Sequence, residues 1–160
     1  VGAALIRAAL EAAPLLPGIK SWCLVTGPNM PQMDFDAISA EAPDNVSVFR
    51  FRKDFASLLA GARLSVSQAG YNTVCDVLQA KCRSLLIPFA AGGETEQSAR
   101  AERLARLGLA QVLEEKSVSG QSMADAIEAA LALPEPGKVY LDLDGAAGTA
   151  RALRRLYDER

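Results

Sequence analysis

The sequence predicts an α/β fold, a doubly wound parallel sheet with helices on both faces. Segments with helical spacing alternate repeatedly with short apolar segments along the chain. The short segments are apolar on both faces, which is typical of parallel strands buried between two layers of helices. The chain has 160 residues, of which 50% are hydrophobic, so it can bury a real core. We therefore expect one α/β domain over residues 1–160.

The elements of the amino-terminal half are predicted from helical spacing and from apolar runs. The alanine- and leucine-rich segment 3–13 has helical spacing and ends where Pro14 and Pro17 cannot continue a helix. Segment 21–26 is a short apolar run closed by Gly27, which indicates a buried strand. By the same criteria we predict helices over 31–40 and 54–60, and strands over 46–51 and 64–67.

The alternation continues in the carboxyl-terminal half. Gly108 closes one predicted helix and Ser119 is the candidate N-cap of another, since its hydroxyl can accept from the first turn. We predict helices over 71–81, 94–107, 119–133 and 145–157, and strands over 84–89 and 110–113.

Composition excludes several kinds of chemistry. The chain contains no histidine, so it cannot by itself supply a Ser-His-Asp triad, a Cys-His nucleophile or a His-bearing zinc site. Its formal net charge of −2 argues against nucleic acid as a partner. No apolar stretch reaches the ~20 residues of a membrane span. Cys23, Cys75 and Cys82 lack CxxC spacing, which favours reduced thiols in a cytoplasmic protein.

The first candidate site follows the strand predicted to end at Ser67. Ligands of doubly wound sheets bind beyond the carboxyl ends of the strands. Gly70 allows close approach to the backbone, and the helix that opens at Tyr71 directs free amides outward, which suits a phosphate. Asp76 lies three residues after Thr73 on one helical face, where a carboxylate could accept both hydroxyls of a ribose. The alternatives are a plain strand-to-helix turn and an aspartate favoured by the helix dipole.

The second candidate segment follows the predicted strand 84–89. Gln97 lies one turn before the inward stripe of its helix, so we expect its amide to face the crevice and bind sugar hydroxyls. Glu96 has Arg100 four residues on, which also fits an ordinary surface ion pair. Arg50, Arg52 and Lys53 could wall a base pocket or form a solvated rim, and the Asp142 and Asp144 pair lacks a third metal ligand.

Two motifs in order make the chain similar to a known family. Ser67, Gly70 and the run Thr73-Val74-Cys75-Asp76 fit the pattern Ser-x-x-Gly followed by T-[VI]-x-E, and the run Ile87-Pro88-Phe89 precedes Glu96-Gln97-Ser98-Ala99-Arg100-Ala101. Together they resemble the carboxyl-terminal, donor-binding domain of GT-B glycosyltransferases. The likeness is strongest to the family 28 branch that contains the lipid-linked N-acetylglucosaminyltransferase of peptidoglycan synthesis. Asp76 stands where that family usually has Glu, and Gln68 where the peptidoglycan enzyme has a basic residue.

The resemblance implies a role for each matched position. The glycine at 70 and the amides after it would hold the diphosphate of a nucleotide-sugar, and the carboxylate at 76 would bind the ribose. The side chains at 96 and 97 would contact the donor sugar, and the backbone at 51 and 52 would read the base. The implied substrate-binding residues are Phe51, Arg52, Ser67, Ala69, Gly70, Tyr71, Asn72, Thr73, Asp76, Gly93, Glu96 and Gln97.

The resemblance also implies that this chain is half of an enzyme. We expect a donor-binding domain that moves a hexose-type sugar from a UDP-sugar, with an amino-terminal acceptor domain missing. The catalytic base would lie in that domain, so no catalytic residue is assigned here, and no cofactor and no metal are expected. A lipid-linked acceptor would place the full protein at the cytoplasmic face of the membrane. The alternatives are a nucleotide-sugar 2-epimerase and a non-catalytic binding or interaction module.

Overall fold

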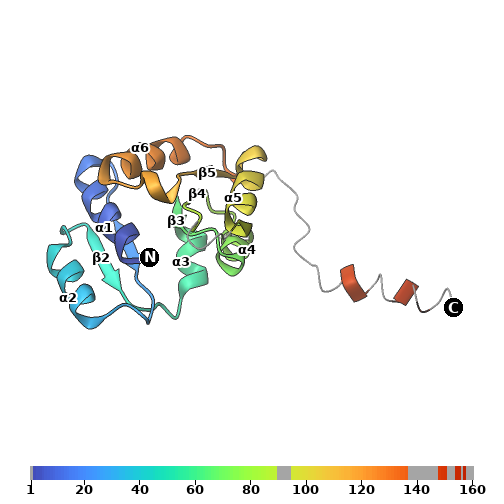
Figure 1. The fold of residues 1–160 in the computed structure, drawn as a ribbon, viewed down its shortest axis with the longest axis horizontal. Coiled ribbons are helices and arrows are strands. Elements are labelled where there is room, and N and C mark those ends of the chain that lie inside the picture. The colour runs from blue at the N-terminus through green and yellow to red at the C-terminus, as the bar shows by residue number, and fades with distance from the viewer. Residues whose placement is uncertain (1, 90–94, 137–147, 151–153, 156, 158–160) are drawn as a thin grey trace.

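The computed structural model describes residues 2–89, 95–136, 148–150, 154, 155 and 157. Helices and parallel strands alternate along it, so the predicted α/β class is confirmed (Figure 1). The helices are α1 (Gly2–Ala12), α2 (Gln32–Glu41), α3 (Phe55–Gly61), α4 (Tyr71–Ala80), α5 (Glu96–Arg106) and α6 (Gly120–Leu131), with short 3₁₀ turns at Ala13–Leu15 and Glu115–Ser117. The strands are β1 (Trp22–Val25), β2 (Val46–Phe49), β3 (Ser65–Ser67), β4 (Ser84–Leu86) and β5 (Ala110–Val112).

The strands form two parallel ladders. β1 pairs with β2, and β4 lies between β3 and β5, with every pair parallel. The sequence predicted one sheet, whereas the described strands divide into a two-stranded and a three-stranded sheet. Trp22 connects the two, because its side chain packs against the buried clusters of both sheets.

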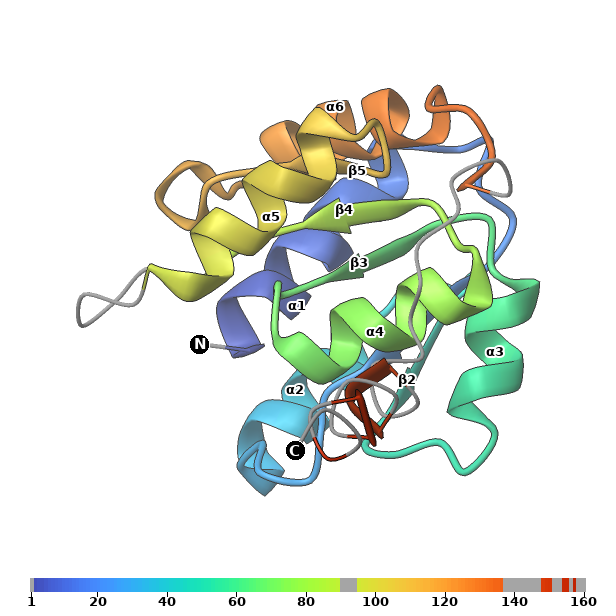
Figure 2. The same cartoon turned by 90° about the vertical axis from the view of Figure 1, so that its right-hand side faces the viewer.

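Helices cover both faces of the three-stranded sheet, as predicted. Leu85 and Leu86, adjacent in β4, are both fully buried but belong to different clusters, because successive side chains of a strand point to opposite faces. The cluster around Leu85 includes α1 and α6, and the cluster around Leu86 includes α4 and α5. Figure 2 shows α4 and α5 on the near side of the strands and α1 on the far side.

Helix α1 lies against both sheets. Its residues Ala8 and Ala12 pack in the cluster of β4 and α6, while Leu10 and the adjoining Ala13 pack with β1, β2 and α2. Small alanine side chains allow this close approach on two sides of one helix. α1 and α2 therefore lie on one face of the molecule, and α4 and α5 on the other.

Several predicted boundaries are corrected by the structure. The strand predicted over 84–89 ends at Leu86, since Pro88 has no N–H to donate, although Ile87 N still donates to Ser67 O at 2.8 Å. The helix predicted from Asp54 begins at Phe55, because Asp54 is its N-cap residue, with a φ of −96° and a ψ of 26° that are not helical.

Other predicted boundaries are confirmed. Ser119 forms a capping box with Ser122, and Gly108 has a φ of +69° just after α5. Of the helix predicted over 145–157, the structure describes helical backbone at 148–150, 154, 155 and 157. The rest of that segment, together with Asp142 and Asp144, lies outside the described residues.

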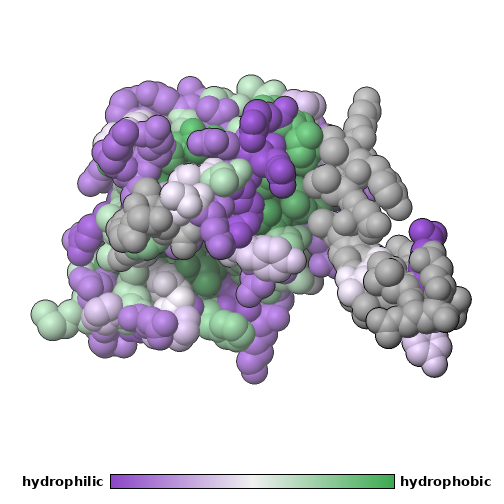
Figure 3. Space-filling view, turned by 45° about the vertical axis from the view of Figure 1, so that its right-hand side comes forward, coloured by the Kyte–Doolittle hydropathy of each residue, from purple (hydrophilic) through white to green (hydrophobic). Residues whose placement is uncertain are grey.

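The surface has a mixed character. Figure 3 shows hydrophilic side chains over much of one face, with hydrophobic ones between them. The large exposed hydrophobic side chains come from separate elements: Leu15, Met33, Phe51, Val66, Tyr71, Leu107 and Tyr157. Within the described part of the chain, no helix has the length and hydropathy needed to cross a membrane.

Candidate donor-binding site

The turn between β3 and α4 has the features expected of an anion site. Gly70 occupies the N-cap position with a φ of −61° and a ψ of 147°, and no side chain caps the helix. The first amides of α4 therefore lack the partner that an N-cap side chain would supply. A Cβ on Gly70 would meet only Thr73 Oγ1, at 4.0 Å, so the turn is open on that side.

Ser67 has a hydroxyl that lacks a partner. Its Oγ is buried and forms no hydrogen bond with any residue that the structure describes. A buried hydroxyl without a partner costs free energy, so such groups usually serve a ligand or an ordered water. Ser67 is the last residue of β3, next to the turn that leads to α4. This position fits the sequence prediction that Ser67 belongs to the site.

Helix α5 is joined to this turn by Arg100. Its Nη1 donates to Ala69 O at 2.6 Å, and its guanidinium lies 5.7 Å from the centroid of the Tyr71 ring. The predicted ion pair is present as well, with 3.8 Å between Arg100 Nη2 and Glu96 Oε2. Arg100 thus brings residues 69 and 71 next to the start of α5, a link that helical spacing alone did not reveal.

Gln97 faces the strand end as predicted. Its Oε1 accepts from Phe89 N at 3.2 Å, so one end of the amide is used to hold the chain after β4. The amide nitrogen at the other end can donate to a sugar hydroxyl. α4 and α5 begin on the same side of the molecule, at the left of Figure 2, where β3 and β4 end. Gly93, the remaining predicted residue of this loop, lies outside the described residues.

Asp76 and Asn72 lie on α4, and both are exposed. Asp76 follows the partly buried Thr73 by three residues, so its carboxylate lies on the same helical face, one turn from the open amides. If the phosphates of a nucleotide lie at the start of α4, its ribose hydroxyls could reach this carboxylate.

The predicted base-binding residues lie beyond β2. Arg52 is committed to local contacts, since its Nε and Nη2 donate to the two carboxylate oxygens of Asp54 at 2.8 and 2.6 Å and its guanidinium lies over Phe49. These hydrogen bonds lower the pKa of Asp54 and raise the pKa of Arg52. Phe51 is 69% exposed. The Arg52 side chain is therefore already engaged, and the role of the backbone at 51 and 52 in reading a base stays a prediction.

The Arg50 side chain contacts the segment that leads into α2. Its Nη1 donates to Met30 O and its Nη2 to Gln32 Oε1, each at 2.7 Å, and its guanidinium lies 4.4 Å from the Phe35 ring centroid. It therefore fastens the end of β2 to the start of α2. For Lys53, both the base pocket and the solvated rim stay predictions.

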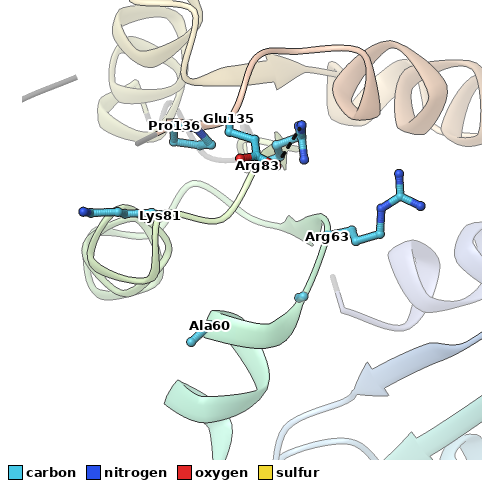
Figure 4. A pocket seen from close by; sticks show the side chains of 7 residues that line it. Ala60, Arg63, Lys81, Arg83, Glu135 and Pro136 are labelled. Atoms are coloured by element: carbon cyan, nitrogen blue, oxygen red, sulfur yellow. Dashed lines mark ion pairs between the residues drawn. The ribbon is translucent and has the colours of Figure 1, made fainter. Parts of the chain in front are cut away.

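A separate cavity lies at the opposite ends of the strands. It has a volume of about 420 Å³ and is lined by Ala60, Ala62, Arg63, Lys81, Arg83, Glu135 and Pro136. Arg83 is already engaged, since its Nε donates to Leu133 O at 2.8 Å and its Nη2 lies 3.7 Å from Glu135 Oε1. Figure 4 shows Lys81 extending to one side and Arg63 to the other. These cations therefore do not converge on one point.

The three cysteines are free thiols, as predicted. Cys82 is buried among Leu59 and Val77, and this burial raises the pKa of its thiol. Burial also raises the pKa of the Cys23 thiol, partly offset by the nearby Arg52. Among the residues described, no cluster of three or more histidine, cysteine, aspartate or glutamate side chains could hold a metal ion.

A comparison with known protein families shows to which family this chain belongs. Residues 1–136 match the model of the glycosyltransferase family 28 C-terminal domain. The chain belongs to this family. The resemblance seen in the two sequence motifs is thereby confirmed.

Curated relatives of this family 28 domain are glycosyltransferases. A UDP-N-acetylglucosamine--N-acetylmuramyl-(pentapeptide) pyrophosphoryl-undecaprenol N-acetylglucosamine transferase of Exiguobacterium sp. is 34% identical over 131 residues, covering 80% of this chain and 36% of the relative. The enzyme of the same name from Bartonella quintana is 32% identical over 108 residues, covering 68% and 29%. The chain thus spans about a third of the length of these relatives.

Solved structures share the fold of this family 28 domain. The MurG of Acinetobacter baumannii superimposes with a TM-score of 0.59 at 24% identity, over 76% of this chain and 37% of that one. The kitacinnamycin glycotransferase gives a TM-score of 0.65 at 20% identity, over 80% and 31%. These similarities support the GT-B type of fold predicted from the sequence.

Proposed function

We propose that this chain is the donor-binding domain of a glycosyltransferase that moves a hexose-type sugar from a UDP-sugar to an acceptor bound elsewhere. The observation that carries the proposal is the open start of α4, where uncapped amides, the Asp76 carboxylate and a Ser67 hydroxyl that has no partner among the described residues occur together. This arrangement offers donors to a diphosphate and an acceptor to ribose hydroxyls. The names of the curated relatives give UDP-N-acetylglucosamine as their substrate.

Most of the predicted residues have a place in this proposal. The amides of Tyr71, Asn72 and Thr73 would hold the diphosphate, since the positive end of the helix dipole favours an anion there. Asp76 would bind the ribose. The amide nitrogen of Gln97 would donate to a sugar hydroxyl, with the adjacent glutamate beside it.

The base would bind at the end of β2 through main-chain groups. Pyrimidine edges present both donors and acceptors, and so does the backbone around Phe51 and Arg52. The Arg52 side chain would act indirectly, because its two hydrogen bonds to Asp54 hold this turn in place. The exposed Phe51 would be covered when the ligand binds.

The chain would act as one domain of a longer enzyme. Its relatives are more than twice as long, so residues 1–160 would form the donor half and another domain would carry the acceptor and the catalytic base. The relatives' names include a pyrophosphoryl-undecaprenol acceptor, and a lipid acceptor of this kind would bring the whole enzyme to the cytoplasmic face of a membrane.

Calorimetric titration of the full-length polypeptide with UDP and with UDP-N-acetylglucosamine tests the proposal. We expect binding of both, and we expect Asp76→Asn to weaken it by about 1–3 kcal/mol, the scale of hydrogen bonds to a charged group. The matched control is Gln79→Ala, another exposed position of α4, which should leave affinity unchanged. Absence of heat at millimolar UDP would refute the proposal. Conversion of the UDP-sugar without any acceptor would assign a 2-epimerase instead.

A further inference from the structure

Tyr71 is a large aromatic residue that lies open at the candidate donor-binding site. It is the first residue of α4 and is 69% exposed. Aromatic side chains are common in ligand sites, where they supply apolar contact area beside the polar groups that orient the ligand. The function proposed above uses only the backbone amide of Tyr71 and leaves its side chain without a role.

Arg100 holds the Tyr71 ring in place. Its guanidinium lies over the ring, 5.7 Å from the centroid, while its Nη1 donates to Ala69 O at 2.6 Å. Arginines also lie over the rings of Phe35 and Phe49, but those two residues are half-buried, whereas Tyr71 is exposed. The Tyr71 ring is therefore supported on one side by a cation and open to a ligand elsewhere. A ring that is already positioned costs less entropy when a ligand binds it.

The Tyr71 side chain and the Asp76 carboxylate lie on different faces of α4. Asp76 follows Tyr71 by five residues, which is a rotation of about 140° around the helix axis. Side chains of a helix tilt toward its amino-terminal end, so that of the first residue extends toward the open start of α4. In a nucleotide-sugar the ribose and the hexose lie at opposite ends of the diphosphate. A ribose bound at Asp76 therefore leaves the hexose for the side of Tyr71.

The start of α5 lies next to the Tyr71 ring. Arg100 contacts that ring, and its Nη2 also lies 3.8 Å from Glu96 Oε2 in the first turn of α5. Gln97 precedes Arg100 by three residues, so these two side chains share one helical face. The amide of Gln97 therefore lies on the face of α5 that reaches Tyr71. Figure 2 shows α4 and α5 beginning on the same side of the molecule.

We propose, on the basis of the function proposed above, that the Tyr71 ring binds the C–H face of the donor hexose. A pyranose ring carries C–H groups on its faces and hydroxyls around its edge. Its apolar face can pack on an aromatic ring while the hydroxyls at its edge bond to polar side chains. Tyr71 would supply the flat apolar surface and Gln97 the donor to a hydroxyl. Together they would orient the sugar, and the Tyr71 side chain would determine how tightly the sugar part of the donor is bound.

Calorimetric titration of the full-length polypeptide with UDP and with UDP-N-acetylglucosamine tests the role of the ring. In each variant, the ratio of the affinity for UDP-N-acetylglucosamine to the affinity for UDP measures the contribution of the sugar. We expect Tyr71→Ala to lower this ratio about 10-fold, and Tyr71→Phe, which keeps the ring, to preserve it. The control is Leu107→Ala, at the exposed C-cap of α5, which should alter neither affinity.

The outcomes distinguish failure of the ring contact from failure of the proposed function. Absence of UDP binding by the parent protein would refute the proposed function and the ring contact with it. Binding of UDP, with the same affinity ratio in the parent and in Tyr71→Ala, would overturn the ring contact alone. An equal fall of the ratio in Tyr71→Ala and Tyr71→Phe would assign the contact to the phenol hydroxyl and would also overturn it.

Nuclear magnetic resonance of the parent complex gives a second measurement that needs no folded variant. We expect nuclear Overhauser effects between the ring protons of Tyr71 and the C–H protons of the hexose in bound UDP-N-acetylglucosamine. Where Tyr71→Ala does not fold, these effects decide. Their absence in a complex whose ribose protons show contacts with the protein would overturn the proposal.

Discussion

Arg100 of α5 donates a 2.6 Å hydrogen bond to Ala69 O, the carbonyl immediately before the N-cap glycine of α4. The carbonyl belongs to a fully buried residue, so the bond fixes the position of the turn relative to α5. Two segments that are far apart in sequence are thereby set side by side at the candidate site. The geometry of the turn at the candidate site therefore depends on a residue of α5.

Substitution Arg100→Met is expected to weaken both the fold and the site. Loss of the bond to Ala69 O leaves that carbonyl without its partner, which should lower the free energy of unfolding by about 1–2 kcal/mol. UDP affinity should fall as well, because the turn loses its support. Urea denaturation and calorimetry measure the two effects. The control Arg103→Met, exposed on the same helix, should change stability by less than about 0.5 kcal/mol, and equal effects of the two variants would contradict this role.

The side-chain carbonyl oxygen of Gln97 is expected to stabilise the folded protein. Gln97→Met removes the acceptor for Phe89 N and should destabilise the protein by about 1–3 kcal/mol. Gln97→Glu keeps an oxygen there and should retain most of the stability. Thermal unfolding of both variants measures the difference. If the two variants have the same melting temperature, the hydrogen bond from Phe89 N to Gln97 does not contribute to stability.

Gly120 is expected to tolerate no side chain. A Cβ there would lie 2.6 Å from Glu11 Cβ and 3.2 Å from the Glu11 carbonyl carbon, so Gly120→Ala forces α1 and α6 apart. Overpacking of this kind costs about 1–3 kcal/mol. Gly61→Ala is the matched control, because a Cβ on Gly61 would meet nothing within 4 Å and the change should be neutral or slightly stabilising. Chemical denaturation of the two variants compares them, and similar midpoints would refute the close contact.

The Arg52–Asp54 pair predicts a dependence of stability on acid pH. Hydrogen bonds from Arg52 lower the pKa of Asp54 in the folded state. A lowered folded pKa means that the stabilisation is present above the unfolded value of about 3.9 and is lost as the pH falls through the folded pKa. The melting temperatures of the parent and of Asp54→Asn should therefore differ at about pH 6 and converge in strong acid. A difference that stays constant with pH would exclude this ion pair as its source.

The sequence predicted most of the elements because local signals decide them. Ser119 and Gly108 mark their helix ends as expected, and the inward position of Gln97 follows from helical spacing. What could not be predicted depends on contacts between distant segments. The hydrogen bond from Arg100 to Ala69 O and the one from Arg50 to Met30 O both depend on tertiary packing. No local pattern in the sequence predicts such packing.

The division of the strands into two ladders could also not be predicted from local sequence patterns. Periodicity identifies strands, but it does not say which strands pair, so a single sheet was the natural prediction. The candidate site is similar. The residue types of the site and their order are present in the sequence. That the Ser67 hydroxyl has no partner among the described residues follows only from the packing around it.

The adjacency of Leu85 and Leu86 has a consequence for how this domain can vary over evolutionary time. Each leucine completes a different core, so inserting or deleting one residue in β4 would send both side chains to the wrong layer. Exchanges among apolar residues of similar volume leave both layers filled. We therefore expect this short strand to drift in identity while keeping its length, and length changes to accumulate in the surface turns.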